Sequence, residues 1–247
     1  MSDSTATESL SQPTNRGAFI VIEGMDRAGK TTQAALLRDR LTAAGRPVEL
    51  IKFPDRTTAI GKMIDAYLRS ATDLDDRAIH LLFSANRWEC ASRIQTALRA
   101  GTTLVCDRYA FSGIAFSAAK LAFAAYAGGF AWCATPDDGL PAPDLVLFLD
   151  VSPEVAAARG GYGLERYERE EVQRAVRKVF ARIGDVDRLV DDQARSVIGR
   201  ARNWHVVDAG KSVEEVADDM WKTVDAAKLT EGTSEPLLRL WDYASLA

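Results

Sequence analysis

The residues best suited to chemistry form a short loop, Gly24-Met25-Asp26-Arg27-Ala28-Gly29-Lys30-Thr31, which fits the pattern G-x-x-x-x-G-K-[ST]. Gly24 and Gly29 allow a tight turn and a close approach of the backbone to a phosphate, whose charge the loop N–H groups can bind. Lys30 would reach the outer phosphates of a nucleoside triphosphate, and the Thr31 hydroxyl would bind Mg²⁺. A chance match becomes improbable where the loop follows a strand and opens a helix.

Two motifs could supply further charge for the same chemistry. In Asp107-Arg108-Tyr109, Asp107 could hold a Mg²⁺-bound water beside Thr31, and Arg108 could neutralise a second phosphate. Arg56, in Phe53-Pro54-Asp55-Arg56, could bind a phosphate with both arms of its guanidinium. Taken singly, the first motif is also compatible with a helix cap and the second with a solvated turn.

A third motif could recognise a planar base. Phe83 and Arg87 are four residues apart in a helical pattern and so share one face, where one side chain can stack and the other can donate hydrogen bonds. Alone, such a pair is more often a core aromatic beside a surface charge.

Two glycine-containing stretches lie later in the chain. Residues 159–169 combine three glycines with Arg159, Arg166 and Arg169, which is typical of a lid that closes over phosphates, although an exposed loop between helices would look similar. Residues 208–212 superficially repeat the G-K-S pattern. His205 stands where the first glycine should be, so we expect Lys211 to lie in a loop that touches an adenine.

The elements that must position these motifs alternate along the chain. Apolar runs predict strands over residues 18–23, 48–53, 102–106, 145–149 and 204–207. Helical periodicity or capping signals predict helices over 31–44, 60–68, 73–100, 112–127, from 152 onward, over 170–183 and over 213–227. This βαβ alternation requires a parallel sheet with helices on both faces. The phosphate loop and the motifs at 53–56, 107–109 and 208–212 each fall at the carboxyl end of a predicted strand, where such sheets bind ligands.

Composition excludes several classes of function. The net charge of -4 offers no basic footprint for nucleic acid. Three cysteines without C-x-x-C spacing and two histidines make a disulfide framework or zinc site unlikely, so we expect a cytoplasmic protein that could also enter the nucleus. The longest apolar stretch, 121–134, is too short to span a bilayer, so we expect no membrane partner.

The chain divides into one domain and two tails. Residues 1–16 read as a disordered tail that lacks the features of a signal or transit peptide. Residues 17–228 read as one domain, and residues 229–247 as a C-terminal tail.

Taken together, residues 23–30, 53–56, 82–88, 107–113, 139–144 and 165–167 closely resemble motifs of the thymidylate kinase family, in its eukaryotic form. The resemblance covers about residues 16–227. It implies a three-layer α/β P-loop kinase fold, with a five-stranded parallel sheet flanked by helices and a lid at about 159–169. It also implies transfer of the ATP γ-phosphoryl group to dTMP with Mg²⁺, weaker activity on dUMP, and a homodimer formed through helices.

The family's roles carry over to matching positions. Asp26 would receive the deoxyribose 3′-hydroxyl, Arg56 and Arg108 the acceptor phosphate, and Phe83 and Arg87 the thymine ring and its O4. The dTMP site would comprise Asp26, Phe53, Arg56, Phe83, Arg87, Arg108, Phe116 and Tyr167. The ATP site would comprise Gly24, Arg27, Ala28, Gly29, Lys30, Thr31, Thr32, Arg159, placed over adenine, and Lys211. The catalytic set would be Arg27, Lys30, Asp107 and Arg108, with Thr31 and Asp107 holding the metal, the latter through water.

Arg27 is the most informative of these residues, because eukaryotic-type members carry the catalytic arginine in the phosphate loop and other members carry it in the lid. Two stretches, 120–132 and 184–202, are longer than the resemblance implies. For the dimer, the apolar stripe Ile79, Leu82 and Phe83 and the region 111–116 are candidate contacts. Two alternatives stay open: a deoxynucleoside kinase, which would leave Arg56 and Arg108 without an acceptor phosphate, and a nucleotide-binding protein with little catalysis.

Overall fold

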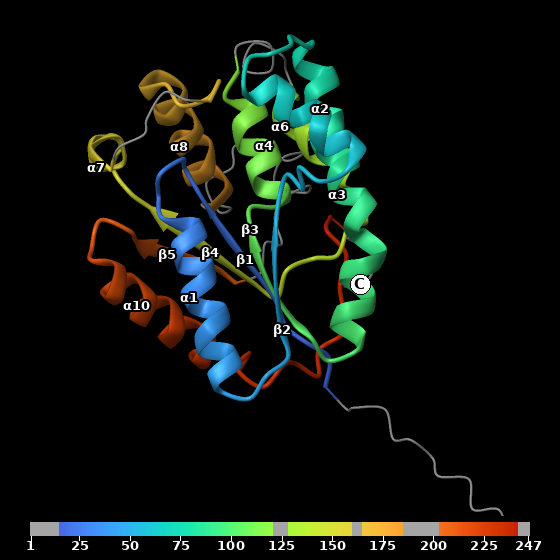
Figure 1. The fold of residues 1–247 in the computed structure, drawn as a ribbon, viewed down its shortest axis with the longest axis vertical. Coiled ribbons are helices and arrows are strands. Elements are labelled where there is room, and N and C mark those ends of the chain that lie inside the picture. Colours follow the sequence, from blue (N-terminus) through green and yellow to red (C-terminus); the bar gives the residue numbers. More distant parts are fainter. Residues whose placement is uncertain (1–14, 121–127, 160–164, 185–202, 242–247) are drawn as a thin grey trace, which may run out of the picture.

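A computed structural model describes residues 15–120, 128–159, 165–184 and 203–241. Strands and helices alternate along these residues in the order that the sequence predicts (Figure 1). The strands are β1 (Phe19–Gly24), β2 (Val48–Lys52), β3 (Thr103–Asp107), β4 (Leu145–Asp150) and β5 (Trp204–Asp208). The helices are α1 (Lys30–Ala43), α2 (Ala59–Leu68), α3 (Asp76–Arg99), α4 (Ala110–Ala118), α6 (Gly129–Ala134), η1 (Thr135–Asp137), α7 (Pro153–Ala158), α8 (Glu170–Gly184) and α10 (Val213–Ala226).

The strands form one parallel sheet in the order β2-β3-β1-β4-β5, which confirms the predicted five-stranded parallel sheet. The chain leaves β1 toward β2 and β3 on one side and later reaches β4 and β5 on the other. This reversal opens a crevice at the carboxyl end of β1, the place where such sheets bind ligands. The phosphate loop follows β1 directly and therefore lies in that crevice.

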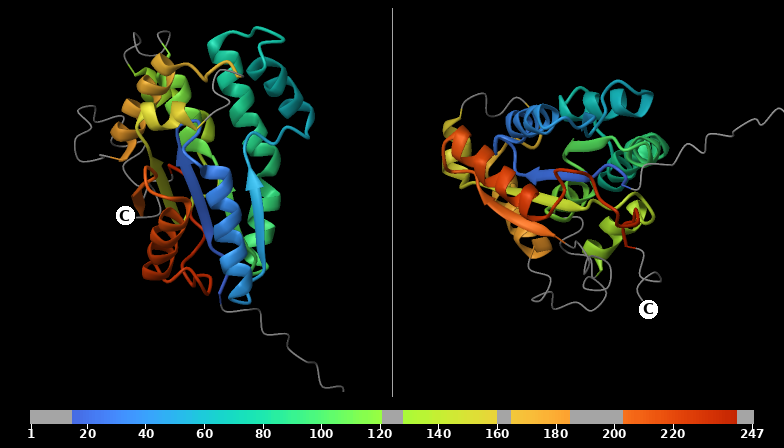
Figure 2. Two further views of the ribbon diagram at one scale, coloured as in Figure 1. Left: turned by 60° about the vertical axis from the view of Figure 1, so that its left-hand side comes forward. Right: turned by 90° about the horizontal axis from the view of Figure 1, so that it is seen from below.

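Helices cover both faces of the sheet, as Figure 2 shows from two further directions. Along β1, Phe19 and Val21 face a core built with α3, α4 and α8, whereas Ile20 and Ile22 face α1 and α10. A strand that is buried on both faces needs apolar residues at nearly every position, which explains why it reads as a continuous apolar run.

Predicted helix starts agree with the structure where a local capping signal exists. Ser152 caps α7 by accepting the N–H of Val155, with Pro153 in the first turn. Ser212 and Glu215 form a reciprocal capping box at the start of α10.

The region around α4 departs from the prediction. The helix expected over 112–127 begins at Ala110 and ends at Ala118, and residues 121–127 lie outside the described residues. The apolar stretch that follows contains α6, and the chain passes from α6 directly into η1. Most of the long segment 184–202 also lies outside the described residues.

Residues assigned to the two tails contact the domain. Arg16 pairs with Asp144 at 2.6 Å. At the other end, Trp241 packs edge-on against Phe111, with ring centroids 5.9 Å apart, and its indole N–H donates to the carbonyl of Ala134. No helix within the described ranges is long and apolar enough to cross a membrane.

Candidate active site

The phosphate loop has the backbone conformation that its glycines were expected to permit. Gly24 has φ +150°, and a Cβ there would lie 2.7 Å from the carbonyl oxygen of Leu149 on β4. Gly29 has φ +91° and stands at the N-cap of α1, so the helix N-terminus opens toward the loop. Lys30 follows it, and its Nζ donates to the carbonyl of Met25. Burial, together with the charge of Arg108, lowers the pKa of Lys30 to about 7.

Thr31 and Asp107 meet at the end of the loop, as the metal prediction requires. The Thr31 hydroxyl donates to Asp107 Oδ2 at 2.6 Å. Lys52, at the end of β2, lies 3.2 Å from the same hydroxyl and 3.4 Å from the same carboxylate oxygen. Burial raises the pKa of Asp107, but the nearby cations outweigh it, so the pKa lies below its usual value.

The chemistry of this donor set fits Mg²⁺. Asp107 Oδ1 is buried and has no hydrogen-bond partner in the described part of the chain. An ionised carboxylate beside a hydroxyl can hold a magnesium ion that keeps most of its waters.

Glu23 organises the start of α4 rather than facing a substrate. Its carboxylate is fully buried and accepts the backbone N–H groups of Tyr109 and Ser112 at 2.9 and 3.0 Å, as well as the Ser112 hydroxyl. It thus caps a helix that lies 86 to 89 residues away in the sequence, which explains why α4 begins earlier than local signals indicate.

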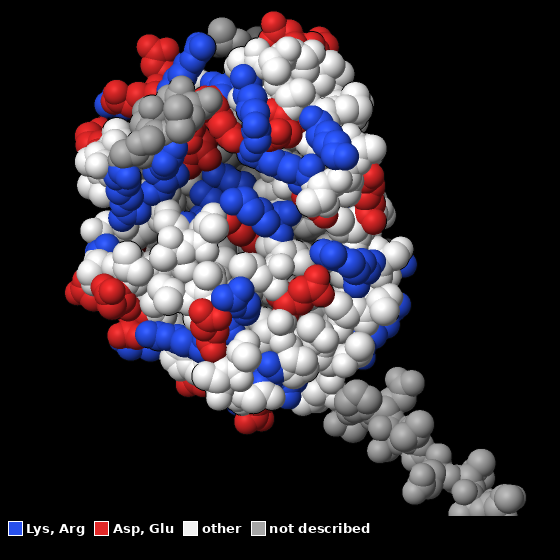
Figure 3. Space-filling view, viewed as in Figure 1, with Lys and Arg blue, Asp and Glu red and all other residues white. Residues whose placement is uncertain are grey.

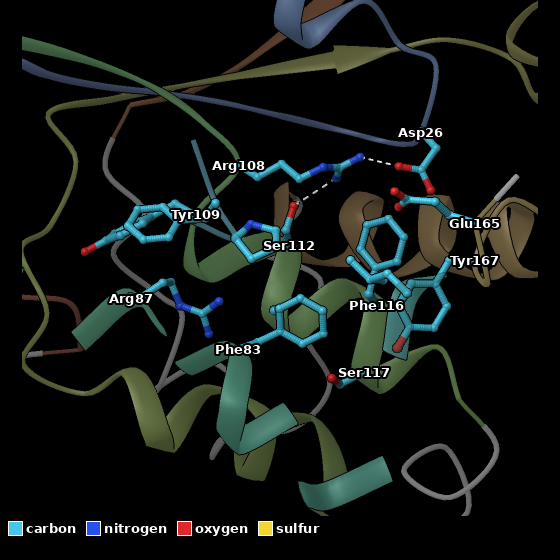
Figure 4. A pocket seen from close by; sticks show the side chains of 14 residues that line it. Asp26, Phe83, Arg87, Arg108, Tyr109, Ser112, Phe116, Ser117, Glu165 and Tyr167 are labelled. Carbon is cyan, nitrogen blue, oxygen red and sulfur yellow. Dashed lines mark hydrogen bonds and ion pairs between the residues drawn. The ribbon is translucent and has the colours of Figure 1, made fainter. Parts of the chain in front are cut away.

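A pocket opens between the loop, α3, α4 and the segment before α8 (Figure 4). Phe83 and Phe116 lie across it from each other, with Tyr167 beside Phe116. The lining residues include seven of the eight predicted dTMP contacts, namely Asp26, Phe53, Phe83, Arg87, Arg108, Phe116 and Tyr167. Arg56 lies at the edge, where it pairs with Asp65 at 2.7 Å and with the pocket residue Glu165 at 2.8 Å.

Arg108 connects this pocket with the phosphate loop. Its guanidinium donates to the carbonyl of Gly24 at 2.9 Å, forms a short ion pair with Asp26, and lies 5.1 Å from the ring centroid of Phe116. The Asp26 carboxylate also accepts a hydrogen bond from the side-chain Nε2 of Gln173 on α8. In return, the side-chain Oε1 of Gln173 accepts the backbone N–H of Asp26. The phosphate loop, the end of β3 and α8 therefore together hold the Asp26 carboxylate at the wall of the pocket.

Arg87 is held at the opposite wall by a residue that sequence reasoning missed. Its Nε and Nη2 donate to the two carboxylate oxygens of Asp137 at 3.0 and 2.6 Å. Both side chains are buried, and Ser84 donates to the same carboxylate at 2.7 Å. Asp137 takes Nε and one N–H of Nη2, so Nη1 and the second N–H of Nη2 are the donors of this guanidinium that Asp137 does not use.

Arg27 and Arg159 meet at the phosphate loop. Arg27 adopts φ +64° and pairs with Glu168 at 3.0 Å. Arg159 donates to the carbonyls of Arg27 and Ala209, so it joins the phosphate loop to the loop after β5. Figure 3 shows lysine and arginine side chains gathered around a hollow on this face.

Lys211 lies in the loop after β5, two residues beyond Ala209, whose carbonyl accepts from Arg159. Lys211 is exposed and pairs with Asp219 at 2.7 Å. Ala28 is buried, whereas Thr31 and Thr32 are exposed at the start of α1. Of the predicted lid, residues 160–164 lie outside the described part of the chain.

The site residues that the sequence-based prediction missed include Lys52, Asp137, Glu168 and Gln173. Lys52 lies near the end of a predicted strand and directly before the Phe53-Pro54-Asp55-Arg56 motif, so its place in the sequence could have indicated a role in the site. The other three pair with partners 50 to 147 residues away and have no local pattern.

Comparisons with known proteins agree with this architecture. The thymidylate kinase family model matches residues 22–220. The chain is 46% identical over 242 residues to a thymidylate kinase of Arabidopsis thaliana, which covers 97% of this chain and 82% of the relative. It is 45% identical over 226 residues to the thymidylate kinase of Homo sapiens, which covers 92% and 98% of the two chains. The solved structure of thymidylate kinase from Candida albicans superposes with a TM-score of 0.78 at 38% identity, over 91% of this chain and 98% of that one.

The matched region contains the phosphate loop, all described residues that line the pocket and the whole sheet except the first three residues of β1, so the likeness includes the residues of the site as well as the fold. The chain belongs to the thymidylate kinase family.

Proposed function

We propose that the chain transfers the γ-phosphoryl group of ATP to the phosphate of dTMP, which gives dTDP for dTTP synthesis, with weaker activity on dUMP. As a thymidylate kinase family member it is a phosphotransferase. The observation that carries the substrate assignment is the position of Arg108, which touches the phosphate loop at Gly24 and the pocket carboxylate of Asp26. A cation between the two nucleotide sites suits an acceptor that is itself a phosphate.

On the donor side, we assign the ATP phosphates to the loop N–H groups and Lys30. Lys30 is held in place by the Met25 carbonyl, and an anion beside it favours its charged form. Arg159 and Lys211 border the neighbouring loop after β5, which is where we place the adenine. Arg27 would release Glu168 and bind the transferred γ-phosphoryl group instead.

We assign the metal to Thr31 and Asp107 and propose that it is Mg²⁺. When bound, it would neutralise charge on the donor phosphates. Asp107 is ionised at neutral pH because the cations around it favour the charged carboxylate, which prepares it for that role. Lys52 reaches the same two oxygens and would add positive charge beside the metal.

On the acceptor side, we assign the sugar 3′-hydroxyl to Asp26 and the phosphate to Arg108 and Arg56. The base would lie between Phe83 and Phe116, since aromatic faces on both walls suit a flat ring. Arg87 would donate its remaining arm to O4 of thymine.

Gly113→Ala tests this placement of Arg87. A Cβ at Gly113 would lie 2.7 Å from Nη2 of Arg87, and Asp137 prevents the guanidinium from moving aside. We expect KM for dTMP to rise about tenfold, equivalent to about 1.4 kcal/mol, with little change in KM for ATP. Steady-state kinetics measures both constants, and an unchanged KM for dTMP would place the base elsewhere.

A deoxynucleoside kinase is the competing enzyme, and it would need a general base for the sugar hydroxyl. Glu23 and Asp107 are the carboxylates that could be considered for this role, but Glu23 caps α4 and Asp107 pairs with Thr31 and Lys52. We therefore expect ADP release with dTMP and none with thymidine. A coupled ADP assay decides between them, and turnover of thymidine without dTMP would reject the proposed function. ATP binding without any ADP release would identify a nucleotide-binding protein instead.

We also propose a cytoplasmic location and a homodimer. The cysteines Cys90, Cys106 and Cys133 are all free, which suits a reducing compartment. Most of the predicted dimer contacts are unsuitable, because Ile79 and residues 111–115 are buried within the chain. The outer face of α3 offers Leu81 and Trp88 instead, two turns apart and 48% and 43% exposed.

A further inference from the structure

A buried histidine lies directly behind the wall of the acceptor pocket. His80 of α3 is fully buried, and its Nδ1 is 2.7 Å from the hydroxyl oxygen of Ser117 on α4. Ser117 lines the pocket, as do Phe83 and Arg87 (Figure 4). His80 itself does not line it and packs against Trp132, with ring centroids 5.2 Å apart. The roles proposed above make no use of His80.

The surroundings of His80 keep its imidazole neutral. Burial, together with the charge of Arg87, lowers its pKa to about 4. The backbone of Cys133, and more weakly that of Gly113, acts in the opposite direction, as carbonyls do when they accept a ring N–H. A neutral imidazole has one N–H and one lone pair, so His80 can accept the Ser117 hydroxyl proton only in the Nε2–H tautomer, in which Nδ1 carries the lone pair.

The lone pair on Nδ1 determines what the Ser117 hydroxyl can do. If the O–H donates to Nδ1, its proton is committed away from the pocket, and the oxygen presents lone pairs to a ligand. Arg87 has only donors, and Asp137 leaves its Nη1 for the ligand. The two walls then offer one donor and one acceptor.

We propose that His80 is a positioning residue for base selection, which holds the Ser117 hydroxyl as an acceptor for the N3–H of a 4-oxo pyrimidine while Arg87 donates to O4. This inference rests on the proposed function, because it requires a pyrimidine nucleotide in this pocket. Cytosine carries the reverse pattern, an amino group at C4 and an unprotonated N3, so it would meet Arg87 with a donor and Ser117 with a lone pair. Unpaired buried polar groups are costly, and such mismatches discriminate strongly.

The first test compares dUMP with dCMP, which both lack the 5-methyl group. In Ser117→Ala and in His80→Phe, we expect the ratio of kcat/KM for dUMP to that for dCMP to fall about tenfold, mainly through KM. The double variant should fall no further, because the two residues act as one unit. If dCMP turns over too slowly, its inhibition constant against dTMP takes its place in the ratio.

Conservative and control variants separate positioning from damage to the fold. Ser117→Thr keeps the hydroxyl and His80→Asn keeps an acceptor, so both should retain most of the discrimination. Ser92→Ala, on an exposed position of α3, and His205→Phe, on exposed β5, make comparable changes away from the pocket and should leave the ratio unaltered. An unchanged ratio in Ser117→Ala would overturn the inference.

A spectroscopic test does not depend on the His80 variants folding. The chain has two histidines, so a ¹⁵N-histidine-labelled sample gives two imidazoles, and His205→Gln assigns them. We expect His80 as the Nε2–H tautomer with an unprotonated Nδ1 throughout neutral pH; an Nδ1–H tautomer would overturn the inference. Failure of the unmodified protein to turn over dTMP would reject the proposed function, whereas normal turnover with an unchanged ratio in Ser117→Ala would reject this inference alone.

Discussion

Arg27→Ala is expected to lower kcat for dTMP by about 10³-fold or more while changing ATP affinity only a few-fold. Phosphoryl transfer depends on positioning and charge neutralisation, and an arginine at the transferred group can contribute roughly 10³–10⁵ in rate. Arg27 lies in the phosphate loop, is 29% exposed at its side chain, and pairs with Glu168. A partly exposed ion pair is weak enough to be exchanged for a phosphate.

Stopped-flow or quench-flow turnover, with ATP affinity measured separately, tests this expectation. Arg27→Lys keeps the charge but loses the planar fork, so we expect an intermediate kcat. Arg174→Ala is a matched control, because Arg174 is exposed on α8 and pairs only with surface acids in the described region. Turnover of Arg27→Ala within threefold of the unmodified enzyme would remove Arg27 from the catalytic set.

The second large effect is expected at Asp137, whose replacement by alanine should lower the free energy of unfolding by about 3–5 kcal/mol. The side chains of Asp137 and Arg87 are 0% and 2% exposed, so removing the acid leaves a buried guanidinium without its partner. Urea unfolding measures the loss as a lower midpoint at an unchanged m-value. Asp138→Ala is the neighbouring control: Asp138 is exposed, and we expect a change within about 0.5 kcal/mol.

A paired variant separates the two roles of Asp137. Arg87→Met with Asp137→Ala removes both charges, and we expect it to recover much of the lost stability, since no buried ion is left unpaired. It should not recover the affinity for dTMP, because the donor to the base is gone. If dTMP binding also returned, Arg87 would have no role in base recognition.

Motifs with short spacing predicted most of the geometry around the phosphate loop. Gly24, Gly29, Lys30 and Thr31 lie within one loop, and their geometry follows from the loop's own backbone. Capping at Ser152 and Ser212 is equally local, since donor and acceptor are three residues apart. The meeting of Thr31 with Asp107 followed from a simple rule, because neighbouring parallel strands bring their carboxyl ends to the same edge.

The arrangement of the pocket between α3 and α4 depended more on long-range packing. Sequence spacing placed Phe83 and Arg87 on one helix face but could not show that Asp137, fifty residues later, takes two arms of the guanidinium. The same limit applies to α4, which starts at Ala110 because a carboxylate from β1 caps it. A buried polar group must find a partner, but its identity depends on which elements the fold brings together.

The sequence by itself therefore determined the parallel sheet, the phosphate loop and the edge of the sheet to which we assign the nucleotides, because these follow from apolar periodicity and from contacts within a few residues. The tertiary structure alone decided how the site is held. It paired Arg87 with Asp137, Asp26 with Gln173, and His80 with Ser117. Each pair joins residues from separate elements, and their desolvation makes the pairing necessary without leaving a pattern in the chain.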